Sequence, residues 1–235
     1  MNFAIIKEHR DFFRKHRWIE FEGLLTKDQK ENLLKESTAV LSKRLKAQAA
    51  DIFQSPADKL FNAGRDLWRD SSKLKKIILG KSLAEAASEL IEKKPLRFGY
   101  DQLFPSPKLS VEEDSYSKFL TEDLTLQEIS CIQGVLCGLM LCIVEPTVSS
   151  SETPLEKSAV FSSRAGNGVI FAPDMPIPLK ELNHRPGAVY LLLVYADVNA
   201  VYCLEEKDYH THHFKRWGYH FGDRLSEILN PLVYK

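Results

Sequence analysis

Apolar residues near the start of the chain recur at three- and four-residue steps, which is the spacing of one helix face. This spacing predicts an N-terminal helix in which Phe12 and Phe13 face a core. From Trp18 to Glu22 the pattern changes to alternation, with Ile19 and Phe21 on one side. Because successive side chains of a strand point to opposite faces, we expect a short, half-buried strand here.

Polar side chains mark the starts of further helices in the front part of the chain. Thr26 with Gln29, and Ser82 with Glu85, have the spacing of a capping box, in which two side chains satisfy free N–H groups at a helix start. Ser55-Pro56 predicts another start, because proline lacks an N–H that the first turn would leave unpaired.

The later part of the chain has the pattern of β-strands. Leu96–Phe104 is expected to be extended, and Ile129–Val144 is apolar on both alternating faces and interrupted by glycines. Val189–Tyr195 is continuously apolar, and Val201–Leu204 predicts one more strand. Such runs are typical of strands that are buried on both faces. Helices followed by antiparallel strands favour a sandwich or barrel with helices packed outside it.

A tight turn is expected at Asn167-Gly168. The dipeptide lies between Ala159-Val160-Phe161 and Val169-Ile170-Phe171, two short apolar runs. Because Asn-Gly readily adopts the left-handed conformations of a two-residue turn, the sequence predicts a β-hairpin in which these runs pair.

Composition is that of an ordinary soluble globular protein, with 235 residues, 44% hydrophobic and 27% charged. No apolar run reaches the roughly 18 residues of a transmembrane helix, and the N-terminus lacks a signal-peptide pattern, so no membrane association is expected. Cys131, Cys137, Cys142 and Cys203 show no Cys-x-x-Cys spacing. Free thiols of this kind predict a reducing compartment, and the expected location is cytoplasmic.

Charge is balanced overall but uneven along the chain. Residues 1–94 contain 20 Lys and Arg against 14 Asp and Glu, an excess of six positive charges that residues 95–235 offset. A basic front half is compatible with nucleic acid or an acidic protein as partner. The cations alternate with carboxylates instead of clustering, which favours solvated helix faces and leaves the partner unknown.

The order of elements resembles that of the iron(II)/2-oxoglutarate dioxygenases, especially the phytanoyl-CoA hydroxylase branch. The similar pieces are the opening Trp18-Ile19-Glu20-Phe21-Glu22-Gly23-Leu24-Leu25-Thr26, the strand Leu96–Phe104, and Gly166–Phe171 followed by Arg185. The chain as a whole also resembles a protein conserved in chlamydiae. The resemblance implies an α+β fold with a double-stranded β-helix core, of the jelly-roll or cupin-like kind, and N-terminal helices packed against it. We expect one domain over 1–235, mainly helical in 1–95 and β-rich in 96–235.

The metal ligands of that family are missing where the resemblance places them. The family binds iron through two histidines and a carboxylate, which leave positions open for cofactor and oxygen. The first pair is expected within 108–118, where carboxylates occur without histidine, and the distal histidine near Asp174-Met175-Pro176, where there is none. Arg185 and Gln102 are the residues that the resemblance leaves as a relic oxoacid pocket. We therefore expect no cofactor and favour a protein that binds without catalysis.

A histidine cluster near the C-terminus keeps two alternatives open. If Asp208–His213 were extended, Asp208, His210 and His212 would lie on one face, as a set of three possible metal ligands next to His213. One alternative is an oxygenase that binds Fe(II) and 2-oxoglutarate with these atypical ligands. The other is a metal-responsive regulator that binds nucleic acid through the basic front half.

Overall fold

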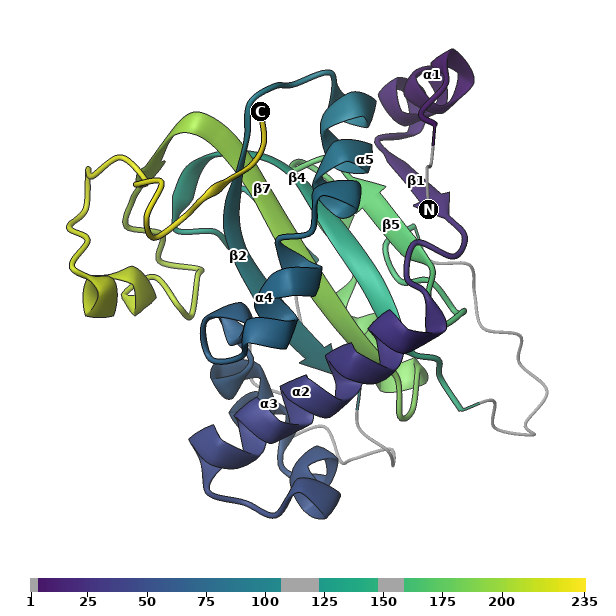
Figure 1. The fold of residues 1–235 in the computed structure, drawn as a ribbon, viewed down its shortest axis with the longest axis vertical. Coiled ribbons are helices and arrows are strands. Elements are labelled where there is room, and N and C mark those ends of the chain that lie inside the picture. Colours follow the sequence, from purple (N-terminus) through teal and green to yellow (C-terminus); the bar gives the residue numbers. More distant parts are fainter. Residues whose placement is uncertain (1–3, 107–122, 148–158) are drawn as a thin grey trace.

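The computed structural model describes residues 4–106, 123–147 and 159–235. Within them, a six-stranded antiparallel sheet has the order β1-β5-β4-β7-β2-β8, and a second sheet pairs β3 with β6. Figure 1 shows the large sheet curled, with helices over one face. The strands are β1 Trp18–Phe21, β2 Leu96–Pro105, β3 Leu124–Thr125, β4 Ile132–Val144, β5 Gly168–Phe171, β6 Pro176–Ile177, β7 Val189–Tyr202 and β8 Leu232–Tyr234.

Five α-helices are described, and four of them follow β1 and precede β2 along the chain. In Figure 1, α2 crosses in front of the sheet, with α4 and α5 above it. The 3₁₀ turns η2 and η6 flank the site described below. The bounds are α1 Lys7–His16, α2 Lys27–Leu45, α3 Ala57–Ala63, α4 Ser72–Ile78, α5 Lys81–Ile91, η1 Ala49–Gln54, η2 Leu67–Arg69, η5 Leu179–His184 and η6 His213–Trp217.

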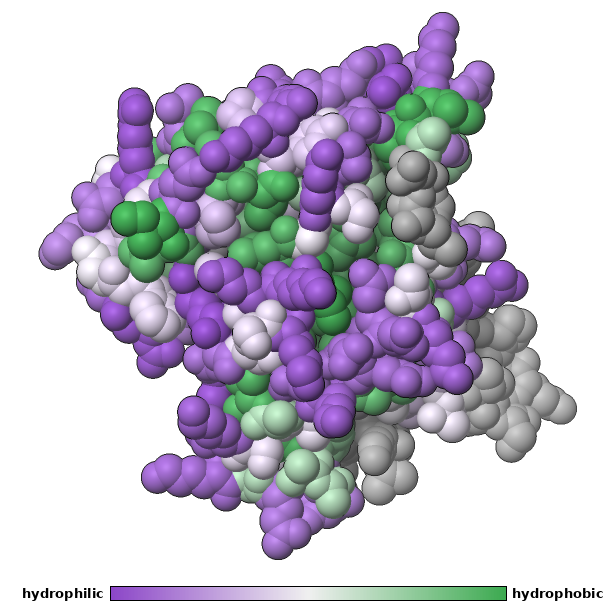
Figure 2. All heavy atoms as spheres, in the orientation of Figure 1, coloured by the Kyte–Doolittle hydropathy of each residue, from purple (hydrophilic) through white to green (hydrophobic). Residues whose placement is uncertain are grey.

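The central strand β7 separates two apolar cores. Leu191 and Leu193 belong to the core under the helices, whereas Tyr190 and Leu192 belong to the core on the other face of the sheet. Since neighbouring side chains of a strand point to opposite faces, burial on both sides explains the continuous apolar run that the sequence shows here. Figure 2 shows the helix-covered face carrying mostly hydrophilic side chains, with apolar ones visible between them.

The α+β organisation with helices packed on a curled antiparallel sheet is confirmed. Ile132–Val144 is one bulged strand with register shifts near Gly134, whose φ is +99°. The separate strand expected at 201–204 is wrong. Val201 and Tyr202 are the end of the long strand β7, which pairs with β4 along its length with register shifts, and residues 203–204 follow it outside the strand. A complete double-stranded β-helix stays a prediction, as does the single domain.

The hairpin predicted at Asn167-Gly168 is wrong. β5 pairs with β1 and β4, and residues 159–161 form no strand. Asn167 instead binds across the sheet edge: its side-chain oxygen accepts a hydrogen bond from Gly23 N, and its amide donates to Glu20. Gly168 lies in a crowded place, because a Cβ there would lie 2.6 Å from Leu24 Cδ1, and the leucine side chains around it would have to shift.

Of the two capping boxes predicted at helix starts, one is present and one is not. Thr26 and Gln29 form the expected capping box at the start of α2. Ser82 and Glu85 do not, because α5 already begins at Lys81. Phe13 is buried as expected, but Phe12 is 40% exposed, since one helix face cannot turn two adjacent side chains fully into the same core. Among the described residues, no helix has the length and apolar character needed to cross a membrane.

Candidate functional site

The loop between α3 and η2 runs antiparallel beside strand β2. Leu103 N donates to Gly64 O over 3.0 Å, and Asp66 N donates to Asp101 O over 2.9 Å, so Arg65 lies opposite Gln102. Gly64 allows this close approach, because a Cβ there would lie 3.0 Å from Leu103 Cβ on β2. The pairing directs a loop side chain onto the face of β2 away from the main helix core.

Arg65 and Asp208 form a buried ion pair, although 143 positions separate them in the sequence. Arg65 Nη2 lies 3.3 Å from Asp208 Oδ2, and both side chains are 3% exposed. The guanidinium carbon also lies 3.2 Å from the centre of the Tyr100 ring. A cation over an aromatic face is stabilised further when both are desolvated.

Asp208 also holds the C-terminal turn against the sheet. Its carboxylate accepts hydrogen bonds of 2.8 Å from the backbone N–H groups of Cys131 and His210. Burial alone would lower the pKa of Arg65, but the neighbouring Tyr100 and Asp208 raise that pKa above its ordinary value. The guanidinium therefore stays charged, and burial raises the pKa of Tyr100 to about 12.

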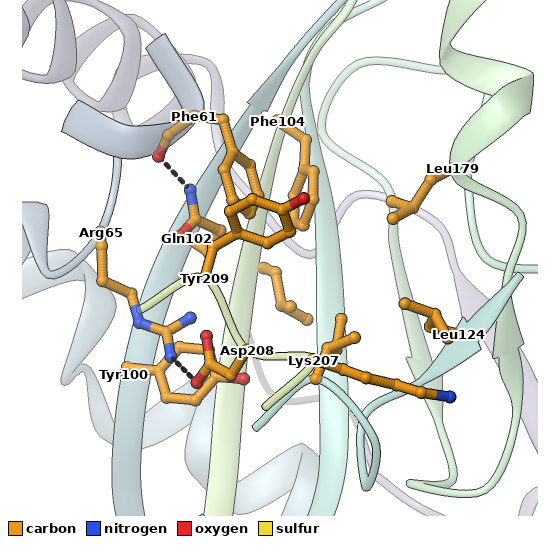
Figure 3. A pocket seen from close by; sticks show the side chains of 12 residues that line it. Phe61, Arg65, Tyr100, Gln102, Phe104, Leu124, Leu179, Lys207, Asp208 and Tyr209 are labelled. Carbon is orange, nitrogen blue, oxygen red and sulfur yellow. Dashed lines mark hydrogen bonds and ion pairs between the residues drawn. The ribbon is translucent and has the colours of Figure 1, made fainter. Parts of the chain in front are cut away.

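A pocket lies beside this ion pair, between strands β2 and β7 and the small sheet (Figure 3). It contains about 390 Å³ of empty space, part of it open to solvent. Figure 3 shows Arg65 and Asp208 pointing toward each other at one end, with the rings of Phe61, Phe104 and Tyr209 gathered at another. The residues that line it are Phe61, Arg65, Tyr100, Gln102, Phe104, Leu124, Ile129, Leu179, Leu192, Lys207, Asp208 and Tyr209.

Gln102 is one of the residues that line this pocket, and its predicted role toward an oxoacid stays a prediction. Its amide nitrogen donates to the carbonyl oxygens of Phe61, at 2.8 Å, and Leu103, at 3.0 Å. Because only the NH₂ group of the amide can donate to two carbonyl oxygens, these contacts identify which end of the side-chain amide is the nitrogen. The other end, Oε1, is buried and has no hydrogen-bond partner among the described residues. Gln102 thus attaches strand β2 to helix α3, while its own oxygen stays covered.

Arg185 lies elsewhere and is not one of the residues that line the pocket. Its side chain is buried, with Nη2 3.3 Å from Glu181 and Nη1 3.5 Å from the Tyr190 hydroxyl. The Tyr190 hydroxyl donates to Ser162 O, and burial raises its pKa above the ordinary value. The structure thus does not bring Gln102 and Arg185 together in the pocket, and a role of Arg185 toward an oxoacid stays a prediction.

The extended conformation that would align the histidine cluster is not adopted. Residues 208–213 form turns that lead into η6, so side chains two apart do not share a face. His210 is buried with Nε2 3.4 Å from Asn62 O, whereas His212 is exposed. His213 points to a different group, with Nε2 3.2 Å from Asp66. The ring nitrogens of His210 and His213 therefore have different partners, although the two rings meet edge to face with centres 6.0 Å apart.

Two more carboxyl groups are buried behind the loop. Asp101 accepts hydrogen bonds from the N–H groups of Leu67, at 2.9 Å, and Trp68, at 3.2 Å. Burial, reinforced by the charge of Asp66, raises the pKa of Asp101 to about 7. Burial would also raise the pKa of Asp66, but His213 and other cations beside it bring that pKa below its ordinary value. This network attaches the loop to the C-terminal turn.

The donor set does not fit the iron centre that the resemblance implies. Within the described residues, no group of three His, Cys, Asp or Glu side chains is placed to hold a metal ion. All seven histidines lie in those residues, and the expected distal position, 174–176, has none. The expected position of the first ligand pair, 108–118, lies outside the described residues, and its sequence contains no histidine.

The fold of the chain is similar to that of solved non-haem enzymes that depend on 2-oxoglutarate, also called alpha-ketoglutarate. The chain is similar to the carbocyclase SnoK from nogalamycin biosynthesis, with a TM-score of 0.66, 14% identity, and 97% of this chain and 96% of that one covered. The epimerase SnoN of the same biosynthesis gives 0.66 and 13%, covering 97% and 98%. The predicted resemblance to this superfamily is confirmed at the level of fold.

A chlamydial protein is also among the similar structures, as the sequence suggested. CT296 from Chlamydia trachomatis has a TM-score of 0.47 and 16% identity, covering 84% of this chain and 99% of that one. At that score the match adds nothing to the argument on fold. No protein-family model matches the chain, and comparison with curated protein sequences finds no significant relative.

Sequence reasoning found Asp208 and Gln102 but missed Arg65 and Tyr100. Arg65 follows a glycine in a stretch that resembles a solvated helix end, and nothing local distinguishes it from an exposed cation. The one available signal was the glycine itself, which marks a close backbone approach.

Proposed function

We propose that this chain is a metal-ligand-deficient member of the oxygenase fold, with a complete jelly-roll core, that binds a small molecule or a partner instead of catalysing oxidation. The observation that carries the proposal is the Arg65–Asp208 ion pair in the pocket beside strand β2. Asp208 is the carboxylate within the histidine-rich segment 208–213, and its oxygens already accept three hydrogen bonds. A carboxylate so committed is a poor metal ligand.

The positions of the imidazoles support the same proposal. An open iron site needs two imidazoles and a carboxylate directed at one point. His210 and His213 have ring centres 6.0 Å apart, and they contact Asn62 and Asp66 respectively. His212 is exposed. These separate directions argue against the oxygenase with atypical ligands, and no described feature favours the nucleic-acid regulator.

Metal titration of the full chain tests this proposal. We expect calorimetric titration with Fe(II) or Mn(II) under anaerobic conditions, with and without 2-oxoglutarate, to give no stoichiometric binding. One-to-one binding that 2-oxoglutarate strengthens would overturn the proposal. If such binding were lost in the double variant His210→Ala with His212→Ala but kept in the matched control His9→Ala with His16→Ala, the atypical-ligand oxygenase would replace it.

A further inference from the structure

Two cysteines lie opposite each other on neighbouring strands. Strands β4 and β7 run side by side (Figure 1), and their register pairs Ile132, the first residue of β4, with Tyr202, the last residue of β7. One position further, Cys131 lies opposite Cys203, and Cys203 N donates a 2.8 Å hydrogen bond to Cys131 O. Directly opposite side chains of an antiparallel pair lie on the same face of the sheet. The two thiols are therefore neighbours at one end of the strand pair.

The spacing of such a pair is close to what a disulfide needs. Opposite residues that share a backbone hydrogen bond have Cα atoms about 5.5 Å apart, inside the range of about 4.4–6.8 Å found for disulfides. Their Cβ atoms, at about 4.5–5.5 Å, are slightly further apart than the roughly 3.5–4.5 Å of a disulfide, so a bond here draws the backbones together. Both residues lie just outside their strands, where the chain can make that adjustment. Bonds under such strain are readily reduced again.

The other two cysteines lack a cysteine neighbour across the sheet. In the pairing of β4 with β7, Cys137 lies opposite Tyr195 and Cys142 lies opposite Tyr190. Both thiols are buried. They serve as internal controls, because they have the same chemistry without the matched position.

The two opposite thiols differ in their access to solvent. Cys131 is fully buried, whereas Cys203 is partly exposed. Burial raises the pKa of both thiols, and the Asp208 carboxylate adds to the rise at each of them. The Gln133 N–H opposes the rise in the pKa of Cys203. Because access and thiolate character decide which sulfur reacts first, Cys203 is the group that an oxidant meets.

We infer that Cys131 and Cys203 form a reversible disulfide bond that links the start of β4 to the end of β7, with a small-molecule disulfide as the oxidant. The Cys203 thiolate attacks one sulfur of the oxidant, and the first small thiolate leaves. The Cys131 thiolate then attacks the Cys203 sulfur and expels the second. The protein loses two electrons and two protons in forming one S–S bond, and the oxidant takes them up as its own S–S bond becomes two thiols.

The bond acts on the part of the chain that holds Asp208. Cys203 leads into the turns that contain Asp208, and the N–H of Cys131 donates to the Asp208 carboxylate. A disulfide that closes a long loop restricts the unfolded chain and so favours the folded one. Oxidation is therefore expected to stabilise the attachment of the C-terminal turns to the sheet. Transient disulfides of this kind occur in reducing compartments as redox sensors.

Peptide mapping of the oxidised protein tests the pairing. The folded full chain is incubated with oxidised glutathione in mildly alkaline buffer, the remaining thiols are alkylated, and cross-linked peptides are quantified by mass spectrometry. We expect the Cys131–Cys203 cross-link to be at least about tenfold more abundant than any other cysteine pair, and to disappear with dithiothreitol. No cross-link, or other pairs in comparable amounts, would overturn the inference.

Three variants test the order of the two steps. Cys131→Ala is expected to stop at the mixed disulfide, with one glutathione retained on Cys203. Cys203→Ala is expected to leave Cys131 unmodified, because that thiol is buried. The matched control Cys137→Ala is expected to form the cross-link as the wild type does. Glutathione on Cys131 but not on Cys203 would contradict the proposed order. If Cys131→Ala fails to fold, the wild type and Cys203→Ala still decide the question.

Urea unfolding tests the effect of the bond on the fold. We expect the oxidised wild type to have a higher unfolding midpoint than the reduced wild type, and dithiothreitol to reverse the shift. Cys203→Ala is expected to show no shift with oxidised glutathione, whereas Cys137→Ala is expected to show the shift of the wild type. An oxidised wild type with an equal or lower midpoint would refute a stabilising bond at this position.

Discussion

Removing Asp208 is the sharpest stability test of the site. In Asp208→Ala the buried Arg65 guanidinium loses its one carboxylate partner among the described residues, and the N–H groups of Cys131 and His210 lose their acceptor. Breaking a buried ion pair from one side costs about 3–5 kcal/mol, because a charge is left uncompensated. Each orphaned N–H adds about 1–3 kcal/mol when water cannot reach it.

These contributions do not add fully, since water and small shifts relieve part of the loss. We expect Asp208→Ala to lower the free energy of unfolding by about 4 kcal/mol or more. That is a large part of the roughly 5–15 kcal/mol of a typical domain. The same substitution made in an Arg65→Met background is expected to cost only about 2 kcal/mol, because no buried cation is then left unpaired.

The measurement is a double-mutant cycle by equilibrium urea unfolding, followed by tryptophan fluorescence and far-ultraviolet circular dichroism. The wild type, both single variants and the double variant are compared under one buffer condition. A loss below about 1 kcal/mol for Asp208→Ala, or an equal loss in both backgrounds, would refute the reasoning. Either result would mean that solvent, not Asp208, compensates the charge of Arg65.

Three other perturbations have defined outcomes. Burial and the nearby Arg65 guanidinium lower the pKa of His210 to about 3, so below pH 6.5 the unfolded state binds more protons than the folded state. The free energy of unfolding of the wild type should therefore fall by about 2 kcal/mol when the pH is lowered to 5, and that of His210→Phe should not show this fall. Burial and the neighbouring Asp66 carboxylate raise the pKa of Asp101 to about 7, so its contribution to the free energy of unfolding is present at low pH and is lost as the pH rises toward 7. Between pH 5 and 8 the wild type should lose about 2–3 kcal/mol in this way, and Asp101→Asn should not. The two effects oppose each other, so each is measured as variant minus wild type in urea unfolding, and parallel pH profiles would contradict them. Gly168→Ala should destabilise by about 1–3 kcal/mol in the same assay, because the new methyl group overlaps Leu24; an unchanged midpoint would show that the sheet edge adapts.

Local patterns were enough to predict many elements of this chain. The capping box at Thr26 and Gln29 depends on side chains three residues apart, and alternation at Ile19 and Phe21 depends on the geometry of one strand. The apolar run at Val189–Tyr195 predicted burial on both faces without any knowledge of what covers them. The capping box and the alternation depend on contacts between residues close in sequence. The apolar run indicates only that the strand is buried, and not which segments bury it.

Pairing between distant segments was decided by the tertiary structure. Asn167-Gly168 has the composition of a hairpin turn, but its glycine is needed where Leu24 packs against the sheet, and its asparagine binds Glu20 and Gly23. A dipeptide pattern cannot tell a turn from a close approach, because both need a small residue and a short polar one.

The candidate site shows the same division. The sequence by itself determined the α+β organisation, with helices packed on an antiparallel sheet, and it determined that histidines are missing where the oxygenase resemblance needs them. Only the tertiary structure placed Arg65 against Asp208, left Gln102 Oε1 without a donor, and directed His210 and His213 to different partners. Elements are selected by local periodicity, whereas a buried charge pair depends on which distant chain segment excludes water from it, and no local pattern encodes that.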